Sequence, residues 1–334
     1  MALDEEGTGL VEVAAGPTGG LQHLPTPSDR LRDYAEAARG AFAPNTERAI
    51  RADTAIFTAW CLAAGLPSLP AAPVDVARFV DETSLTKRPA TVRRYVSSVS
   101  HMHRAAELPN PALHSLVQLA LRRMNRSKGR EQRQAEALTR RLVDRLLDTA
   151  GATIRDARNR ALLAVAYDTL ARRSELVAMQ VRDVAIGAEG HGTVTIRRGK
   201  TDQEGRGSER YLAPDTSRLI VVWLDEAKVL DGTLFCAVLR WGKIGGALEA
   251  GEVARVFKGM AVAAGVPADQ VARISAHSSR IGAAQDMAAS DRIELPAIMQ
   301  AGGWKSPQMV ALYTRRQAAR RSGAAKLAEL QNRS

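Results

Sequence analysis

Four short segments in the second half of the chain combine residue types that can act on a phosphodiester. In chain order they are Arg172-Arg173-Ser174-Glu175, Lys200-Thr201, His277-Ser278-Ser279-Arg280, and Gly302-Gly303-Trp304 with Tyr313 nine residues after the tryptophan. Two arginines can hold the non-bridging oxygens of a phosphate through paired hydrogen bonds. A tyrosine becomes an attacking group once its proton is removed, and a lysine can protonate the leaving hydroxyl. Together these segments predict phosphoryl transfer on a nucleic acid backbone.

Each segment also has an ordinary explanation when it is taken alone. Arg172 and Glu175 are three residues apart, as in many helical ion pairs, and His277 and Arg280 have the same spacing. The tryptophan and Tyr313 would also fit a turn followed by a packed aromatic residue. The functional prediction therefore depends on the occurrence of all four segments, in this order, in one chain.

The charge balance favours a polyanionic partner. The 334 residues include 47 Lys and Arg against 36 Asp and Glu, a net charge of +11. Such a charge is suited to binding nucleic acid or an anionic membrane surface. The charge alone is also compatible with a soluble basic protein that has no such partner. The sequence has no uninterrupted apolar run of about 18 residues, so no membrane span is expected. The acidic start Met-Ala-Leu-Asp-Glu-Glu does not resemble a signal peptide. With two cysteines, no disulfide framework is expected. We therefore expect a protein of the cytoplasm, associated with the nucleoid.

Helical patterns and one stretch of strand chemistry must position these residues. Residues 1–28 are rich in Gly and Pro and are expected to form a mobile tail. Residues 29–125 predict an all-helical bundle, with helices over 45–64, from Pro73, from Pro89 and over 112–125. A basic linker at 126–135 leads to a second, mostly helical domain at 136–334. There, Gly192–Arg198 and Arg210–Leu212 predict a small antiparallel sheet with Lys200 at the turn.

The motifs resemble those of the tyrosine recombinase, or phage integrase, family. Arg172 to Leu176 is similar to the first catalytic box, His277 to Ala284 to the second, and Ile298 to Trp304 with Tyr313 to the third. Many members have histidine where Trp304 lies, and the indole is typical of the Cre-like branch. The resemblance covers most of residues 45–330, and its motifs are specific only in combination.

The resemblance implies a role for each residue. Arg172 and Arg280 would bind the scissile phosphate with help from His277 and Trp304, and Lys200 would be the general acid for the leaving 5′ hydroxyl. Glu175 would orient the arginine–histidine site, and His277 would accept the proton of Tyr313. Attack by Tyr313 would give a 3′-phosphotyrosyl link that conserves the bond energy. Neither a metal ion nor another cofactor is therefore expected.

Family architecture further implies a clamp on double-stranded DNA with inverted-repeat target sites. The helix at 90–104 would enter a major groove, and the residues expected to contact DNA are Arg48, Arg93, Arg94, Arg158, Arg240 and Arg273. Any of these arginines could instead face solvent. The apolar side of the segment from about Arg316 to Leu330 would dock on a neighbouring subunit, assembling a homotetramer on DNA, or would pack within its own chain.

Three other functions remain compatible with these residues. A type IB topoisomerase would use similar chemistry without a specific site, and a telomere resolvase would close hairpin ends. A catalytically silent DNA-binding or architectural protein belongs to a different class, and the complete nucleophile set argues against it. Formation of a covalent adduct with a nicked half-site would separate the enzymes from the binding protein.

Overall fold

The computed structural model describes residues 25–129, 134–197, 207–320 and 322–333. The chain divides into two compact units, Met1–Arg133 and Gln134–Ser334. Of the tail expected at residues 1–28, residues 1–24 lie outside the described residues, as does Lys200.

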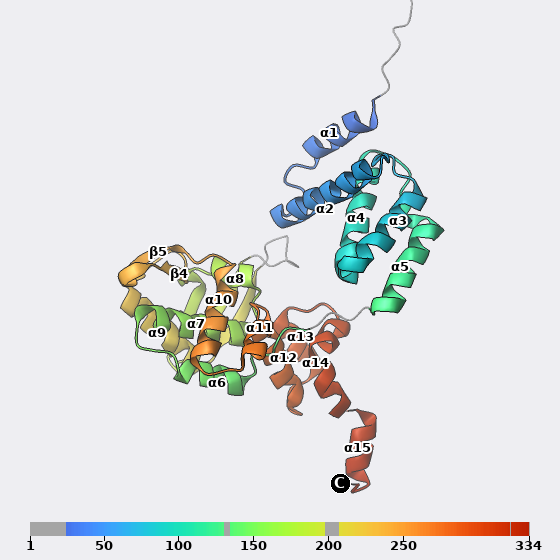
Figure 1. The fold of residues 1–334 in the computed structure, drawn as a ribbon. Helices are drawn as coiled ribbons and strands as arrows, with labels where there is room; N and C mark the ends of the chain where they lie inside the picture. The colour runs from blue at the N-terminus through green and yellow to red at the C-terminus, as the bar shows by residue number, and fades with distance from the viewer. Residues whose placement is uncertain (1–24, 130–133, 198–206, 321, 334) are drawn as a thin grey trace, which may run out of the picture. The chain divides into compact units, whose positions relative to one another are not determined.

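Unit 1 is a bundle of α-helices (Figure 1). The helices are α1 (Pro27–Ala37), α2 (Pro44–Ala63), α3 (Pro73–Thr86), α4 (Pro89–Ala105) and α5 (Ser115–Lys128), with the short 3-10 helix η1 (Pro111–Leu113) before α5. The first four helices each have proline in their first turn, where its missing N–H costs no hydrogen bond. Gly65, at φ +67°, ends α2 in the left-handed conformation.

Two details of unit 1 differ from the sequence-based expectation. Helix α1 was not predicted, and its first turn includes the end of the expected tail. Its start is stabilised by a capping box in which Thr26 and Asp29 exchange hydrogen bonds with each other's backbone. Helix α5 continues to Lys128, three residues into the expected linker. The capping box of α1 is thus a local signal that does not depend on an apolar pattern.

The core of unit 1 is formed largely by apolar residues of α2, α3 and α4. Its fully buried side chains include Phe57, Cys61, Phe79, Val80, Val92 and Val99. The rings of Phe57 and Phe79 meet edge to face at 5.1 Å between centroids. Helices α2 and α4 also pack against each other through their apolar sides. This packing determines which polar side chains of the two helices meet.

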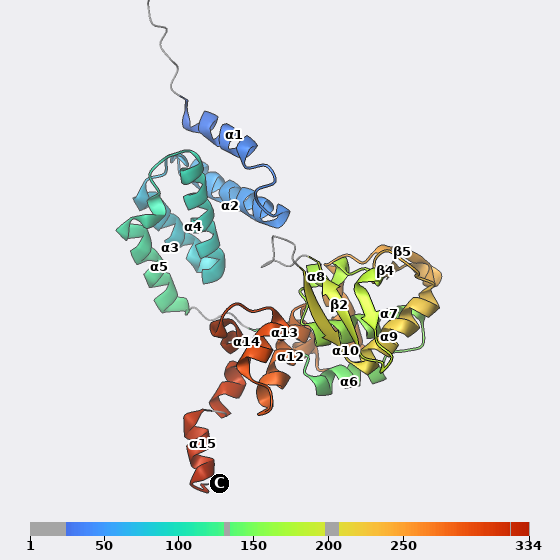
Figure 2. The same cartoon turned by 180° about the vertical axis from the view of Figure 1, so that it is seen from behind.

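Unit 2 combines helices with two small antiparallel sheets (Figure 2). Its α-helices are α6 (Arg140–Asp148), α7 (Ile154–Thr169), α8 (Arg173–Ala178), α9 (Pro214–Ala227), α10 (Glu252–Ala263), α11 (Ala268–Arg273), α12 (Ser278–Ala289), α13 (Leu295–Gly302), α14 (Pro307–Arg320) and α15 (Gly323–Leu330). The strands are β1 (Val184–Ile186), β2 (Gly192–Ile196), β3 (Ser208–Leu212), β4 (Cys236–Val238) and β5 (Ile244–Ala247), with 3-10 helices η2 (Val181–Asp183) and η3 (Arg240–Gly242).

The predicted antiparallel pairing of β2 and β3 is confirmed. Val194 lies opposite Arg210, and Thr195 lies opposite Glu209. Strand β1 pairs with the other edge of β2, and β4 pairs with β5. Strands β1, β4 and β5 were not predicted, because they are three or four residues long and therefore too short for a clear alternating pattern.

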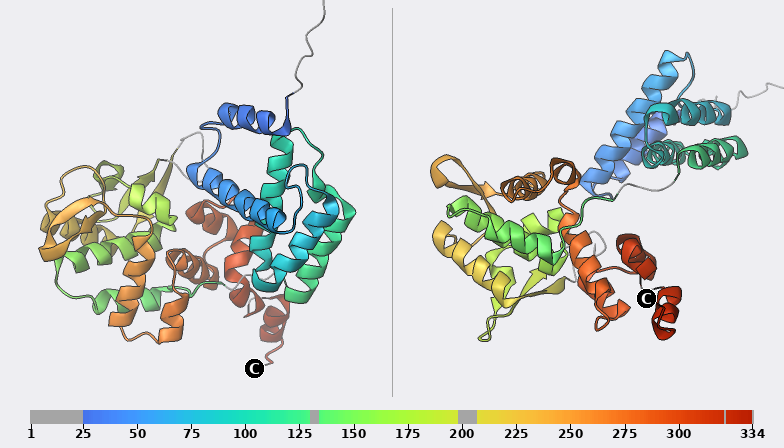
Figure 3. Two further views of the ribbon diagram at one scale, coloured as in Figure 1. Left: turned by 45° about the horizontal axis from the view of Figure 1, so that its top comes forward. Right: turned by 60° about the horizontal axis from the view of Figure 1, so that its bottom comes forward.

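Two buried clusters organise unit 2. The larger one joins α6, α7, α9 and α10 with the sheets, and Trp223 and Phe257 are among its fully buried side chains. The smaller one contains Leu170, Ala284, Ile298, Trp304 and Val310, drawn from the end of α7 and from α12, α13 and α14. These last three helices lie side by side in each view (Figure 3). The smaller cluster supports the residues that could do chemistry.

Candidate active site

Tyr313, His277 and Trp304 come together although 36 residues separate the first two. Tyr313 projects from α14, and its hydroxyl lies 2.8 Å from Nε2 of His277. His277 is the N-cap residue of α12, and its ring centroid lies 5.3 Å from that of Tyr313. The Trp304 ring, in the turn after α13, lies 5.2 Å from the Tyr313 ring. His277 can thus act as a base toward the Tyr313 hydroxyl, since the two groups are within hydrogen-bond distance.

Arg280, on the first turn of α12, contacts the ring of Trp304. Its side chain is buried, with the residue 2% exposed, and its Nη2 donates to the carbonyl of Gly302 at 2.6 Å. Its Nη1 donates to the carbonyl of Leu170, and the guanidinium carbon lies 4.5 Å from the centre of the Trp304 ring. These contacts hold the guanidinium over the indole ring at the distance of a cation–π pair.

Two buried donors at this point have no partner among the described residues. They are Nε of Arg280 and Nε1 of the Trp304 indole. A buried donor without an acceptor costs about 1–3 kcal/mol, so such groups are unusual unless a ligand satisfies them. An oxygen-rich anion such as a phosphate would supply acceptors for both.

Arg172 approaches from the junction between α7 and α8. Leu170 is buried and adopts the left-handed conformation, at φ +50°, which is strained for a residue with a branched side chain. This turn ends α7 and places Arg172 as the N-cap of α8. Nη1 of Arg172 donates to Glu175 at 2.7 Å, and its backbone N–H donates to the other carboxylate oxygen at 2.8 Å.

The expectation that Arg172 and Glu175 share a helical face was wrong in its geometry. Arg172 has extended backbone angles, φ −73° and ψ 153°, and so lies before the helix. The two residues still meet because a side chain three residues inside a helix can reach back to the N-cap. Arg173 is the first residue of α8 and is exposed.

Burial and like charges determine the protonation of the site. Burial, followed by the charges of Arg280 and Arg172, lowers the pKa of His277 to about 4. Burial also lowers the pKa of Arg280 to about 10, with a further contribution from Arg172 and an opposing one from Tyr313. At neutral pH His277 is therefore uncharged and able to accept a proton, whereas Arg280 remains a cation.

Arg210 also lies in this region, although its sequence context did not predict a role for it. It extends from β3, and its Nη1 donates to the Gln300 carbonyl at the end of α13 at 2.6 Å. A Cβ added to Gly303, which has φ +59°, would lie 2.7 Å from Nη2 of Arg210. Burial lowers the pKa of Arg210, while the nearby Glu175 opposes that shift. The alternation of β3 was visible in the sequence, but the partner of its inward arginine was not.

The arginines expected to contact DNA have different environments. In unit 1, Arg48 is exposed and donates to Asn45, Arg93 is half-buried and donates to Asn125 at 2.6 Å, and Arg94 is exposed. In unit 2, Arg240 is exposed, and Arg273 forms ion pairs with Glu136 and Asp269. The side chains of Arg48, Arg94 and Arg240 are thus exposed to solvent.

Arg158 is the exception, and its assignment as a DNA contact is withdrawn. The residue is 5% exposed, and its guanidinium donates to the carbonyl of Cys236 at 3.2 Å and to Asn159 at 2.9 Å. Burial lowers its pKa to about 10. The side chain joins α7 to β4, and a duplex could reach it only if this part of the core opened.

Within the described parts of the chain, no helix has the length and apolarity needed to cross a membrane.

Comparison with known proteins places this arrangement in a wider context. The sequence profile of the phage integrase family matches residues 136–320. Over 306 residues the chain is 30% identical to recombinase Cre of Escherichia phage P1, covering 86% of this chain and 87% of that protein. Over 282 residues it is 29% identical to an integrase/recombinase xerD homolog of Selenomonas ruminantium, covering 81% of each.

Solved structures share the fold at lower sequence identity. The Tn1549 transposon integrase in complex with circular intermediate DNA has a TM-score of 0.63 at 14% identity, covering 91% of this chain and 99% of that one. The XerH site-specific recombinase bound to its palindromic difH substrate has a TM-score of 0.58 at 18% identity, covering 77% and 72%.

Proposed function

The chain belongs to the phage integrase family and is a tyrosine recombinase, and we propose that it cleaves and rejoins duplex DNA through a covalent bond to Tyr313. The observation that carries this proposal is the hydrogen bond between the Tyr313 hydroxyl and neutral His277, beside a buried arginine–indole pair with two unpartnered donors. A nucleophile, its base and an anion site thus lie within one small volume. Relatives that share the fold have been solved on DNA substrates.

The first chemical step transfers the phosphoryl group from DNA to the protein. Tyr313 Oη attacks phosphorus while its proton passes to Nε2 of His277. The bond from phosphorus to the 5′ oxygen breaks, and that oxygen leaves as a hydroxyl after taking a proton, for which Lys200 is the proposed donor. Arg172, Arg280 and the Trp304 N–H would stabilise charge on the non-bridging oxygens, which a pre-positioned site does at little reorganisation cost.

The second step reverses the first with a different 5′ hydroxyl. That hydroxyl gives its proton to Lys200, which lost one in the first step, and its oxygen attacks the phosphorus of the 3′-phosphotyrosine. The bond from phosphorus to Tyr313 Oη breaks, the new phosphodiester forms, and Tyr313 recovers its proton from His277. The number of phosphoester bonds is unchanged in each step, so no nucleotide hydrolysis is needed. The arginine cations take the part that divalent ions play at many other phosphoryl-transfer sites.

Partners follow from the same proposal. We propose that residues 29–125, within unit 1, form a DNA-binding domain that is joined by a basic linker at 126–135 to the catalytic domain at 136–334. Double-stranded DNA with inverted-repeat target sites would be the substrate, and the protein would act at the nucleoid. Arg48, Arg93, Arg94, Arg240 and Arg273 are the proposed DNA contacts, and the active form would be a homotetramer on DNA.

Helix α15 is the proposed assembly element. None of its residues is buried, and Leu330 is 82% exposed while Leu327 is half exposed. An apolar side left uncovered favours docking on a neighbouring subunit over packing within the chain. Deletion of residues 322–334 should spare binding to a single site and reduce tetramer formation in sedimentation measurements on DNA. Normal tetramers from the truncated protein would contradict this role.

The decisive experiment is covalent trapping on a suicide substrate, a duplex nicked near the cleavage point so that the released fragment diffuses away. The wild-type protein should form a 3′-phosphotyrosyl adduct, whereas Tyr313→Phe should bind the same duplex with nearly unchanged affinity and form none. An adduct in Tyr313→Phe would identify another nucleophile. Absence of any adduct from the wild-type protein would favour a silent DNA-binding protein, and relaxation of plasmids without specific sites would favour a topoisomerase.

A further inference from the structure

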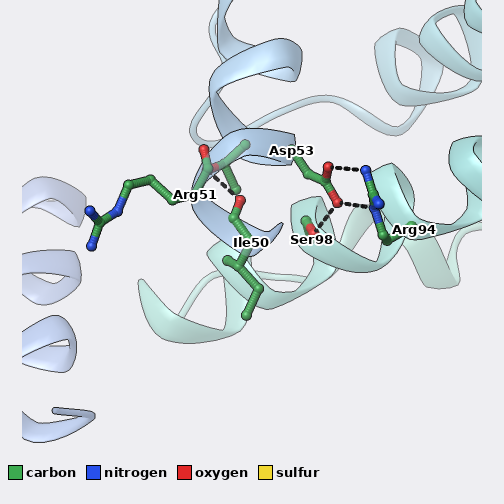
Figure 4. A network of polar contacts seen from close by, with 6 residues as sticks. Ile50, Arg51, Asp53, Arg94 and Ser98 are labelled. Carbon is green, nitrogen blue, oxygen red and sulfur yellow. Dashed lines mark hydrogen bonds and ion pairs between the residues drawn. The ribbon is translucent and has the colours of Figure 1, made fainter. Parts of the chain in front are cut away.

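A buried carboxylate in unit 1 fixes the direction of an exposed arginine. Asp53, on α2, has no exposed side-chain surface, whereas the side chain of Arg94, on α4, is 56% exposed. Nε and Nη2 of Arg94 each donate to a different oxygen of Asp53 at 2.8 Å, and the Ser98 hydroxyl donates to one of them at 3.2 Å (Figure 4). This side-on pairing uses one edge of the planar guanidinium.

The other edge of the guanidinium is left free. Arginine has five N–H donors, and the pair with Asp53 uses two of them, which leaves two on Nη1 and one on Nη2. No described residue accepts a hydrogen bond from Nη1 of Arg94. Because the guanidinium is flat and one edge is bound, the remaining Nη1–Nη2 fork has a fixed direction away from α2.

Stability alone is a poor explanation for this pair. Removing a carboxylate from water costs several kcal/mol, roughly as much as its ion pair returns, so apolar replacements of such pairs are often neutral or stabilising. Asp53 lies four residues before Phe57 and eight before Cys61, both fully buried, so an apolar residue would fit the same stripe. The nearby Arg51 is exposed and extends away from the pair (Figure 4).

The pair is also poorly suited to neutralising phosphate. Attraction to the DNA backbone depends on net positive charge, and the Asp53 carboxylate cancels that of Arg94 locally. Directional donors remain, and a two-donor fork matches the O6 and N7 acceptors of guanine in the major groove. Asp53 raises the pKa of Arg94 through its hydrogen bonds, so the fork keeps all its protons.

We propose that Asp53 is a positioning residue that fixes Arg94 to select guanine at one base-pair position of each half-site. The inference rests on the proposed function, since it requires unit 1 to bind DNA. It goes further by naming the base that is recognised, the arginine that contacts it and the carboxylate that orients the arginine.

Selection from random duplexes tests this inference on the full-length protein carrying Tyr313→Phe, so that binding stays non-covalent. In this background the selected sites should contain one position with guanine preferred. Asp53→Asn and Arg94→Ala should both lose the preference at that same position, with a fall of about 5- to 150-fold in discrimination for Arg94→Ala, the range for one bidentate contact, and at least about 5-fold for Asp53→Asn. Preferences at the other positions should stay unchanged.

A double variant protects the test against misfolding and adds a gain of function. Asp53→Val with Arg94→Gln removes the buried charge together with its partner, and glutamine is complementary to adenine. The preference at the same position should change from guanine to adenine. Arg78→Ala is the matched control, because Arg78 is equally exposed and pairs with a carboxylate, Glu82, on the surface of α3; it should leave every position unchanged.

Each failure has a distinct meaning. If Asp53→Asn folds and keeps the guanine preference, or if the double variant does not change the base selected, the positioning role is wrong. Equal loss at all positions with a smaller salt dependence would show a phosphate contact instead. If the protein selects no DNA at all, the proposed function fails first.

Discussion

Removing the Arg172 guanidinium should nearly abolish DNA cleavage, whereas removing that of its neighbour Arg173 should not. Arg172 is 26% exposed in its side chain and bonded to Glu175 beside the anion site, while Arg173 begins α8 and is exposed. Loss of one donor to a developing charge costs about 2.7–4 kcal/mol, or roughly 10²–10³ in rate. Arg173→Ala should stay within about tenfold, equivalent to about 1.4 kcal/mol.

A stability effect accompanies the first substitution and must be separated from it. The Glu175 side chain is only 6% exposed, and Arg172→Ala removes the hydrogen bond from Nη1 but keeps the one from the backbone N–H. A hydrogen bond to a charged group contributes about 1.5–3 kcal/mol, so the free energy of unfolding should fall by an amount of that order. Arg172→Lys retains the cation without the fork, and should recover stability more fully than cleavage.

The assay is single-turnover cleavage of a suicide duplex that the wild-type protein has selected, with DNA affinity and thermal unfolding measured for each variant. Saturating protein removes any difference in affinity, and a temperature well below every melting point removes the stability effect. If Arg173→Ala loses as much rate as Arg172→Ala, or more, the first motif must be assigned one residue later and the site geometry described above is not the catalytic one.

Three further predictions concern the protonation, support and electrostatics of the site. The pKa of His277 should be about 4 by NMR titration of the free protein; because the unfolded value is about 6.5, the free energy of unfolding should fall as the pH drops from about 6.5 to 4, and His277→Gln should weaken that dependence. A titration near 6.5 would contradict the burial of the ring. Arg210→Ala should slow cleavage about tenfold or more with DNA affinity retained, and Arg210→Lys should restore part of the rate. Arg182→Ala, an exposed control in the same unit, should match the wild type. Equal cleavage rates for all three variants would show that Arg210 has no role in positioning α13. Cleavage should persist in excess EDTA, and magnesium dependence would refute the arginine-based mechanism. Binding should weaken with salt at a log–log slope of about −0.9 per phosphate contacted, and a flat salt response would contradict the clamp on DNA.

Local sequence was sufficient to predict most helices of unit 1 and the residues that could do chemistry. Pro44, Pro73 and Pro89 begin helices because proline fits the first turn and little else in a helix. The order of the arginine, histidine, tryptophan and tyrosine motifs along the chain was sufficient to indicate the family. The position of Lys200 remains a prediction, because that residue lies outside the described part of the chain.

Only the tertiary structure determined what each polar side chain meets. It placed Arg172 before a helix instead of within one, buried Arg158 against Cys236, and paired Arg210 with the end of α13. Asp53 could have been noticed as a carboxylate in an apolar stripe, but its partner lies 41 residues away. Spacing along a helix or strand determines which residues share a face. The partner of that face depends on how distant segments pack. Burial and charge at that contact then determine whether an arginine stabilises the fold, orients a neighbouring residue or is free to bind a phosphate.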